Sequence, residues 1–374
     1  MDAAGIIFTD SFDAELGGLT NNRTLASIPF AGRYRLVDFP LSNMANAGIR
    51  NIGIITKKNY QSLMGHVRSG GDWDLDRKNG GLTVLPPFSR DNNSNGDVYE
   101  NRLEGLLANT SYLKGLPEKY IIMSSCANVS NVDLEKVLEA HIQSGARITL
   151  LYAKNPLNCQ KGIDSTCFRL DQDENVTELI VTDDRSDDMV ISMNTFVFSR
   201  DDLMDILWKA DRDNLESLRR DVIASIVQEG GAKAYGVDDP VLFIDNVSGY
   251  LASSLSLLEE EIQDQLFRNE KRPIITPARD SAPTRYGKNA KASNSLIADG
   301  AIIEGEVRNS VIFRGVHIKE GALVENSVVM QGAEISENAR VNYAVIDKKA
   351  LIDEERLLSG YVTHPFYAER KARI

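Results

Sequence analysis

The sequence predicts an α/β domain followed by a parallel β-helix, and three observations support this order. Residues 4–8 form a short apolar run typical of a buried first strand. A helical pattern over 42–49 is followed by a strand pattern over 51–56, which together with the first strand makes a βαβ unit. From 294 to 345, small and β-branched residues recur without helical spacing. We therefore expect a mostly parallel sheet first and a repeat domain second.

Length and composition exclude several classes of protein. The 374 residues are 42% hydrophobic, enough for a sizeable core and about two domains. The net charge of -12, with no basic stripe, argues against a nucleic-acid partner. Because no apolar run reaches the roughly 18 residues of a membrane span and no signal pattern opens the chain, we expect a cytoplasmic protein without a membrane partner. Cys126, Cys159 and Cys167 lack metal-binding spacing and are expected to be reduced thiols.

The turn after the first strand is acidic. In α/β proteins this turn usually cradles phosphate with backbone amides, glycines and a basic side chain. Here Asp10, Asp13 and Glu15 occupy it, and their charges repel phosphate. The sequence therefore predicts a nucleotide-binding framework whose loop disfavours the nucleotide.

The next thirty residues carry a resemblance to a known enzyme family. Leu16, Arg23 and the run 28–43 resemble the opening of ADP-glucose pyrophosphorylase (glucose-1-phosphate adenylyltransferase), in the degenerate GlgD-type form of its subunit. The resemblance implies a Rossmann-like nucleotidyltransferase domain with a mixed, mostly parallel sheet. It also implies that the β-helix is left-handed.

The same resemblance implies that five functional groups of the family are missing. Glu15 replaces a basic residue of the phosphate loop, and Leu25 replaces a lysine. Ala127 stands where the family has an aspartate that holds magnesium. Val181 and Thr182 stand where a glutamate and a lysine grip the sugar phosphate. We therefore expect this chain to have no catalytic residues.

One carboxylate of the family's metal pair remains, at Asp245. A single carboxylate is a weak magnesium site, because magnesium needs several hard oxygen ligands. We therefore expect no metal or other cofactor on this chain, with Asp245 as a weak candidate. Magnesium would be held by a catalytic partner.

Between these positions the sequence predicts alternating strands and helices. Strands are expected at 120–123, 146–153, 166–170 and 176–181, and amphipathic helices at 131–144, 201–210, 215–229 and 253–269. The stretch 69–95, rich in Gly, Asp and Asn, predicts a mobile loop. His141 is expected on a helix surface, and Cys126 is expected to be a small buried packing residue.

Prolines between 273 and 283 mark a domain boundary. We expect a nucleotidyltransferase-like domain over 1–268, a linker over 269–285 and the β-helix over 286–374. In the last region, segments beginning with asparagine recur at intervals of 15, 17 and 16 residues, at Asn294, Asn309, Asn326 and Asn342. This period predicts about four coils of a β-helix that turns on Gly or Asn.

A regulatory anion site is a further expectation. In the family, basic residues that match Arg23, Arg35 and Lys348 belong to an allosteric pocket for metabolite phosphates. The planar fork of arginine gives paired hydrogen bonds to phosphate oxygens. The alternative interpretation is that these three residues are surface or interdomain salt-bridge residues.

The resemblance thus implies a regulatory, nearly inactive subunit that activates the catalytic ADP-glucose pyrophosphorylase subunit in bacterial glycogen biosynthesis. The partners implied are that catalytic subunit, in a hetero-oligomer expected to be a tetramer, and a sugar-phosphate effector. Two alternatives stay open: weak adenylyltransferase activity of the chain itself, and a sugar-phosphate sensor without an enzyme partner. An acyltransferase with His317 as base is disfavoured, because no second catalytic group is recognisable.

Overall fold

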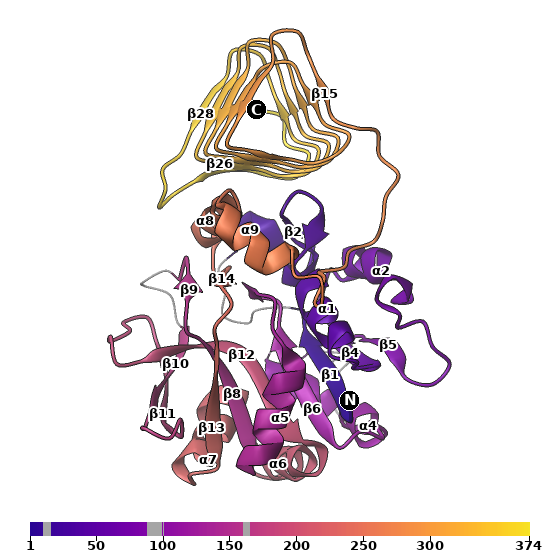
Figure 1. Cartoon of the computed structure of the whole chain (residues 1–374), viewed down its shortest axis with the longest axis vertical. Helices are drawn as coiled ribbons and strands as arrows, with labels where there is room; N and C mark the ends of the chain where they lie inside the picture. Colours follow the sequence, from indigo (N-terminus) through magenta and orange to yellow (C-terminus); the bar gives the residue numbers. More distant parts are fainter. Residues whose placement is uncertain (10–15, 88–98, 100, 160–164) are drawn as a thin grey trace.

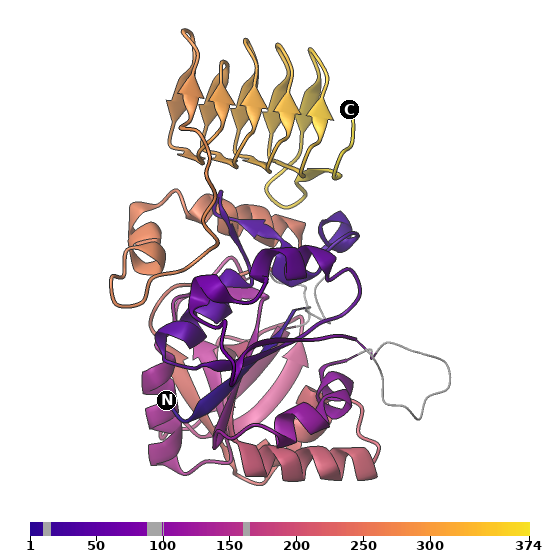
Figure 2. The same cartoon turned by 90° about the vertical axis from the view of Figure 1, so that its right-hand side faces the viewer.

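The computed structural model describes residues 1–9, 16–87, 99, 101–159 and 165–374. An α/β domain forms the larger part of the molecule, and a three-sided β-helix stands at one end of it (Figures 1 and 2). Among the described residues, no helix has both the length and the apolar character needed to cross a bilayer.

A nine-stranded sheet organises the α/β domain. Its central strand β1 (Ala3–Phe8) runs parallel to β4 (Asn51–Ile55) on one side and to β6 (Tyr120–Ser125) on the other. The strand order is β11-β10-β12-β6-β1-β4-β5, with β8 paired to β12 and β13. Since β12 is antiparallel to β6, the sheet is mixed, as expected. The other strands are β5 (Gly81–Leu85), β8 (Ile148–Ala153), β10 (Ser165–Leu170), β11 (Val176–Thr182), β12 (Val190–Ser199) and β13 (Ala232–Val237).

Each face of the sheet buries its own hydrophobic core, because successive side chains of a strand point to opposite faces. Ile7 belongs to the core on one face, and Ile6 and Phe8 belong to the core on the other. The first core contains residues of α1 (Asp38–Asn46), α5 (Leu134–Ser144), α8 (Val247–Ser256) and α9 (Glu260–Phe267). The second contains residues of α3 (Arg102–Ala108), α4 (Thr110–Lys114), α6 (Arg200–Arg212) and α7 (Ala224–Gln228).

Several expected elements differ from those observed. The stretch 253–269, expected to be one helix, contains the end of α8 and all of α9. Both helices bury apolar side chains in the same core, so their sequences resemble one continuous amphipathic helix. The helix expected over 215–229 begins as a π-helix, η4 (Leu218–Ile223), and continues as α7. The expected loop 69–95 contains β5, which pairs with β4, and residues 88–95 of that loop lie outside the described residues.

His141 is buried at 3% exposure, so its expected place on a helix surface is wrong. Its Nδ1 is 2.8 Å from Thr149 Oγ1 on β8, and burial lowers the pKa of the imidazole. Cys126, in contrast, is fully buried, as expected. Short elements complete the domain: β2 (Pro29–Phe30), β3 (Tyr34–Arg35), α2 (Gln61–Val67), β7 (Asn128–Val129), β9 (Pro156–Leu157), β14 (Val241–Phe243), and the 3-10 helices η1 (Gly17–Thr20), η2 (Leu25–Ser27) and η3 (Gly71–Trp73).

The left-handed β-helix has three parallel sheets of five strands each, one coil more than the repeats suggested. A ladder of asparagine side chains runs along one corner, with Nδ2 to Oδ1 distances of 2.9 Å from Asn294 to Asn309 and 2.6 Å from Asn309 to Asn326. The strands are β15 (Arg285–Tyr286), β16 (Lys291–Ser293), β17 (Leu296–Ile297), β18 (Ile302–Ile303), β19 (Glu306–Arg308), β20 (Val311–Ile312), β21 (His317–Ile318), β22 (Leu323–Glu325), β23 (Val328–Val329), β24 (Glu334–Ile335), β25 (Arg340–Asn342), β26 (Ala344–Ile346), β27 (Leu351–Ile352), β28 (Leu357–Ser359) and β29 (Phe366–Ala368).

The β-helix and the α/β domain share a continuous core. Buried residues inside the coils belong to the same hydrophobic cluster as α1 and α8. Helix α8 lies against the β-helix face that contains β23 and β26. The coils are therefore packed on the sheet domain through apolar contacts.

Candidate functional site

The carboxyl ends of β1, β4 and β6 meet at one edge of the sheet, which is the edge where open α/β sheets bind ligands. Just beyond β1, the Thr9 hydroxyl donates to the Ile55 carbonyl at 3.0 Å, and the Thr9 carbonyl accepts from the Ala26 amide at 2.9 Å. Leu25, one of the five positions where the resemblance implies a lost functional group, is 1% exposed and lies in the core. Glu15, another of them, lies outside the described residues.

Ala127 follows the end of β6 and is 6% exposed. Its amide donates to Ser125 Oγ at 3.1 Å, and its carbonyl accepts from the Ile244 amide at 2.9 Å. The next residue, Asn128, donates from Nδ2 to the Met193 carbonyl at 2.6 Å. This loop therefore has a methyl group at position 127, and the side-chain amide of Asn128 donates its hydrogen bond to β12.

Asp245 lies close to Ala127, because the amide of its neighbour Ile244 donates a hydrogen bond to the Ala127 carbonyl. Burial raises the pKa of Asp245 to about 6. Its Oδ2 is buried and has no hydrogen-bond partner among the described residues. In the part of the chain that the structure describes, no three His, Cys, Asp or Glu side chains gather as metal ligands require. One carboxylate beside a methyl group does not fit magnesium.

Val181 and Thr182 end the edge strand β11, where they pair with Thr166 and Ser165 of β10. Thr166 accepts a hydrogen bond from Arg219 Nη1 at 2.7 Å and donates to Asn194 Oδ1 on β12 at 3.4 Å. These contacts lead back to the end of β6, because the Met193 carbonyl holds Asn128. Positions 127, 181 and 182 therefore lie at the same end of the sheet, with β10 and β12 between them, and none of the three carries a charge.

Arg102 is a residue at this edge that sequence reasoning missed. It is 5% exposed, its guanidinium lies 5.4 Å from the centre of the Phe8 ring, and its Nη2 donates to Ser125 Oγ at 3.2 Å. A cation thus stands between the ends of β1 and β6. The only local signal is that Arg102 follows Asn101, whose side chain caps α3 by accepting from the Glu104 amide.

A second candidate site lies between the two parts of the molecule. Arg35 on β3 and Lys348 after β26 line one small cavity of about 30 Å³, room for about two water molecules. The cavity is strongly basic, because three more arginines, Arg33, Arg279 and Arg314, line it. The full lining comprises Pro29, Gly32, Arg33, Tyr34, Arg35, His66, Thr276, Pro277, Arg279, Phe313, Arg314, Gln331 and Lys348.

The basic groups of this cavity destabilise one another. Burial, with the nearby Arg35 and Arg23 cations, lowers the pKa of Lys348 to about 7. Burial also lowers the pKa of Arg35 to about 10, and the Arg279 cation adds to the shift. Arg314 is 6% exposed and donates from Nε to Asp299 at 3.0 Å, while its Nη2 has no hydrogen-bond partner among the described residues. An anion placed here would relieve this repulsion.

Arg23 lies beside the cavity but does not line it. It forms a buried ion pair with Asp347 of the β-helix, whose side chain is 1% exposed. The Tyr367 hydroxyl donates to the same carboxylate at 2.7 Å, and Arg23 Nε donates to the Leu19 carbonyl at 2.8 Å. Arg23 therefore has the contacts of an interdomain salt-bridge residue, whereas Arg35 and Lys348 face a common cavity.

Comparison with known proteins assigns families to both parts of the chain. The nucleotidyl transferase family model matches residues 14–230, and the GlmU-like C-terminal hexapeptide model matches residues 277–360. Together the two matches confirm the expected fold class.

Individual relatives match most of the chain. The glycogen biosynthesis protein GlgD of Bacillus subtilis is 29% identical over 324 residues, which cover 85% of this chain and 81% of that protein. A glucose-1-phosphate adenylyltransferase of Bacillus mycoides is 30% identical over 319 residues, covering 83% and 82%. Another, of Clostridium perfringens strain 13, is 28% identical over 330 residues, covering 87% and 82%.

Proposed function

Because this chain belongs to the glucose-1-phosphate adenylyltransferase family of nucleotidyl transferases, we propose that it is a regulatory subunit of that enzyme with negligible activity of its own. The similarity to GlgD and to the adenylyltransferases supports a role in glycogen biosynthesis. In the proposed role, the chain associates with a catalytic subunit as a hetero-oligomer in the cytoplasm, and magnesium is held by that catalytic subunit.

The observation that carries this proposal is the structure of the β6 loop. At the carboxyl ends of the parallel strands, where open α/β sheets bind ligands, Ala127 and Asn128 have no carboxylate. Asp245 is buried, and its pKa is raised to about 6. Loss of one electrostatic contact to a transition state typically costs about 3 kcal/mol. Val181, Thr182 and Leu25 lack charged groups as well, so the metal, the triphosphate and the sugar phosphate all lose contacts.

The basic cavity supports the regulatory half of the proposal. Arg35 and Lys348 come from different parts of the fold, so an anion that contacts both would stabilise one arrangement of the β-helix on the sheet domain. We infer that a sugar phosphate is the effector and that only its phosphate group enters this cavity of about 30 Å³. Its differential affinity for two arrangements would then change the activity of the partner through the shared interface.

A direct assay of the purified chain tests the absence of catalysis. With ATP, glucose 1-phosphate and magnesium, no ADP-glucose should form, and magnesium ATP at about 100 times an ordinary dissociation constant should not add the roughly 2.7 kcal/mol that such binding gives. Ala127→Asp alone should not restore activity, because the other groups remain absent. Steady product formation by the unaltered chain would favour the alternative, a weak adenylyltransferase.

A further inference from the structure

A small cavity lies beneath helix α1, on the face of the sheet that α1 covers. Its volume is about 10 Å³, and residues of α1, α5, β6, β7 and β12 line it. Three elements each contribute a polar side chain: Asn43 from α1, Ser124 from β6 and Thr195 from β12. The cavity is therefore polar, although it borders a hydrophobic core.

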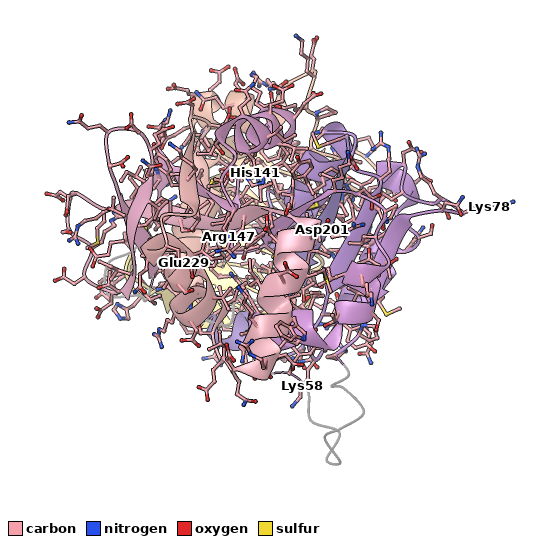
Figure 3. All side chains as sticks on the ribbon, turned by 90° about the horizontal axis from the view of Figure 1, so that it is seen from below. Lys58, Lys78, His141, Arg147, Asp201 and Glu229 are labelled. Carbon is pink, nitrogen blue, oxygen red and sulfur yellow. The ribbon has the colours of Figure 1, made fainter. Side chains whose placement is uncertain are left out.

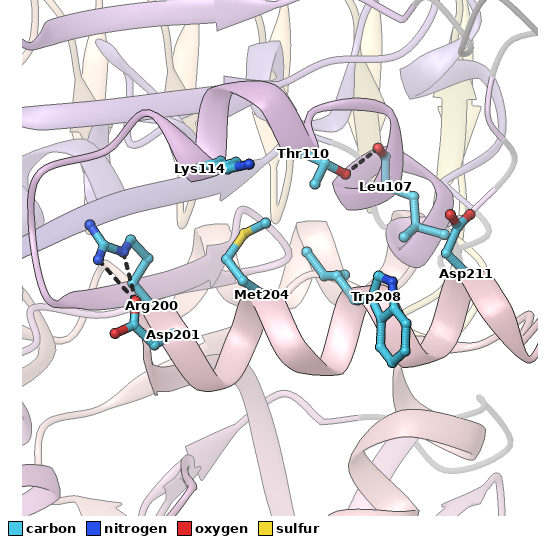
Figure 4. Close-up of a pocket in the computed structure, with 9 residues that line it drawn as sticks. Leu107, Thr110, Lys114, Arg200, Asp201, Met204, Trp208 and Asp211 are labelled. Carbon is cyan, nitrogen blue, oxygen red and sulfur yellow. Dashed lines mark hydrogen bonds and ion pairs between the residues drawn. The ribbon is translucent and has the colours of Figure 1, made fainter.

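The larger groove between α6 and the helices α3 and α4 differs from this cavity (Figure 4). Its volume is about 560 Å³, and it is open to solvent. Trp208 beside it is 63% exposed, and Arg200 pairs there with the exposed Asp201 at 2.9 Å. Bulk water can hydrogen-bond the polar atoms of that groove, whereas the polar atoms beneath α1 are shut away from it.

The side-chain amide of Asn43 is only half paired. Asn43 is 6% exposed, and its Nδ2 donates to the Ser130 carbonyl at 3.1 Å. A carbonyl can only accept, so the amide nitrogen must face Ser130. The Oδ1 atom is buried and has no hydrogen-bond partner among the described residues. A buried acceptor left in this way costs stability.

The two hydroxyls of the cavity are also incompletely paired. Ser124 Oγ and Thr195 Oγ1 lie 3.3 Å apart on the neighbouring strands β6 and β12. One hydroxyl donates to the other, and within the described part of the chain neither makes another hydrogen bond. Since each hydroxyl has one hydrogen, one of the two hydrogens has no acceptor. The cavity thus combines an unused donor with an unused acceptor.

Another buried polar pair shows how such groups are satisfied directly. His141 of α5 (labelled in Figure 3) lies 2.8 Å through Nδ1 from Thr149 Oγ1, so each group is the partner of the other. No contact of this length joins Asn43 Oδ1 to either hydroxyl. A third group is needed to connect them.

We propose that this cavity binds one water molecule, which donates to Asn43 Oδ1 and accepts from the Ser124–Thr195 hydroxyl pair. A buried water needs about 10–15 Å³ of such volume and two to four polar partners, so the cavity suits one water. The described residues that line it carry no charge, so an ion would be buried without a counter-charge. This inference does not rest on the proposed regulatory function.

The bound water would link α1 to two strands of the sheet. Asn43 already holds the Ser130 carbonyl, and Asn128 holds the Met193 carbonyl. The water adds a connection from α1 to β6 and β12, directly behind the turn at Ala127 and Asn128. Because its partners come from three separate elements, we expect this water to exchange slowly with the solvent.

A crystal structure of the unaltered chain gives the first test. At a resolution of about 1.5 Å, one water should lie about 2.7–3.2 Å from Asn43 Oδ1 and from one of the two hydroxyls. A cavity without electron density would overturn the proposal. So would an ion in the cavity, or a direct hydrogen bond between Asn43 Oδ1 and a hydroxyl.

Oxygen-17 magnetic relaxation dispersion counts the long-lived waters in solution. Ser124→Ala/Thr195→Val, which removes both hydroxyls, should hold one long-lived water fewer than the unaltered chain. Asn43→Leu, which removes the acceptor, should show the same loss of one.

Ser254→Ala is the matched control for this count. Ser254 is 1% exposed, and its hydroxyl donates within α8 to the Tyr250 carbonyl at 2.8 Å, so its removal should leave the count unchanged. A count that stays the same in Ser124→Ala/Thr195→Val and in Asn43→Leu would overturn the proposal. A loss of one water in Ser254→Ala as well would also overturn it, because the loss would then not be specific to this cavity.

Discussion

At the scale of single residues, Arg23 and Asp347 are the pair that joins the two parts of the chain. Both side chains are buried, with exposures of 5% and 1%. Arg23→Met should lower the free energy of unfolding by about 3–5 kcal/mol, because Asp347 then remains as a buried charge without its cation, held only by hydrogen bonds from the Tyr367 hydroxyl and the Lys348 amide. Urea denaturation measures this loss. Arg268→Met, which breaks an exposed pair with Asp264, is the control and should change stability far less. Equal losses in the two variants would contradict the assignment.

Lys348 should make stability depend on pH. Its pKa is lowered from 10.5 to about 7 in the folded chain, so between these values the unfolded chain binds more protons. The free energy of unfolding therefore rises with pH across this window, and this contribution is absent below about pH 7. The difference between the unaltered chain and Lys348→Met, measured by denaturation from pH 6 to 10, should show this rise. A constant difference would refute it.

The same lysine should control anion binding. Sulfate keeps its charge across neutral pH, so any change in its affinity comes from the protein. Because Lys348 is cationic only below about pH 7 unless an anion is bound, the affinity for sulfate should fall as pH rises from 6 to 9. Calorimetry should find this fall in the unaltered chain and a flatter profile in Lys348→Met. Identical profiles would exclude Lys348 from the site.

Asp245 gives the opposite dependence on pH. Burial raises its pKa from 3.8 to about 6, so charging it in the folded chain costs stability above that range. Asp245→Asn should therefore stabilise the chain at pH 8 by about 1–3 kcal/mol and have little effect at pH 4. Thermal unfolding at the two pH values measures this. Magnesium that stabilises the unaltered chain but not Asp245→Asn would show that a metal site remains.

At the scale of elements, the asparagine ladder holds one corner of the β-helix. Asn309 has a φ of 45°, in the left-handed region that most side chains avoid. Asn309→Gly loses only the side-chain hydrogen bonds to Asn294 and Asn326, whereas Asn309→Ala also adds backbone strain of about 1 kcal/mol. Denaturation should therefore rank alanine below glycine in stability. The reverse order would contradict this account.

The sequence could predict those elements whose pattern is local. The apolar run near the N-terminus indicates a buried strand, and the repeats that begin at Asn294 indicate the coils of a β-helix. The structure contains both, as expected. His141 was misplaced because its helix packs a polar side chain against Thr149, a contact that no periodicity signals. Arg279 and Arg314 were missed for a similar reason, since they join Arg35 only when the β-helix packs on the sheet domain.

At the scale of the whole molecule, the continuous core and the Arg23–Asp347 pair connect the β-helix to the sheet domain. In the proposed regulatory role, an effector in the basic cavity would act on this connection, and a partner would carry out the catalysis. The proposed regulatory function is therefore tested most directly in a mixture of this chain with a catalytic subunit.

The most direct measurement is the rate of ADP-glucose formation by a catalytic glucose-1-phosphate adenylyltransferase subunit from the same cell, with and without this chain. The account predicts that the chain raises the rate or the response to sugar phosphate. It also predicts that Lys348→Met reduces the response while a mixed oligomer still forms. A catalytic subunit with the same rate and the same effector response in both cases, and no mixed oligomer at micromolar concentrations, would contradict it.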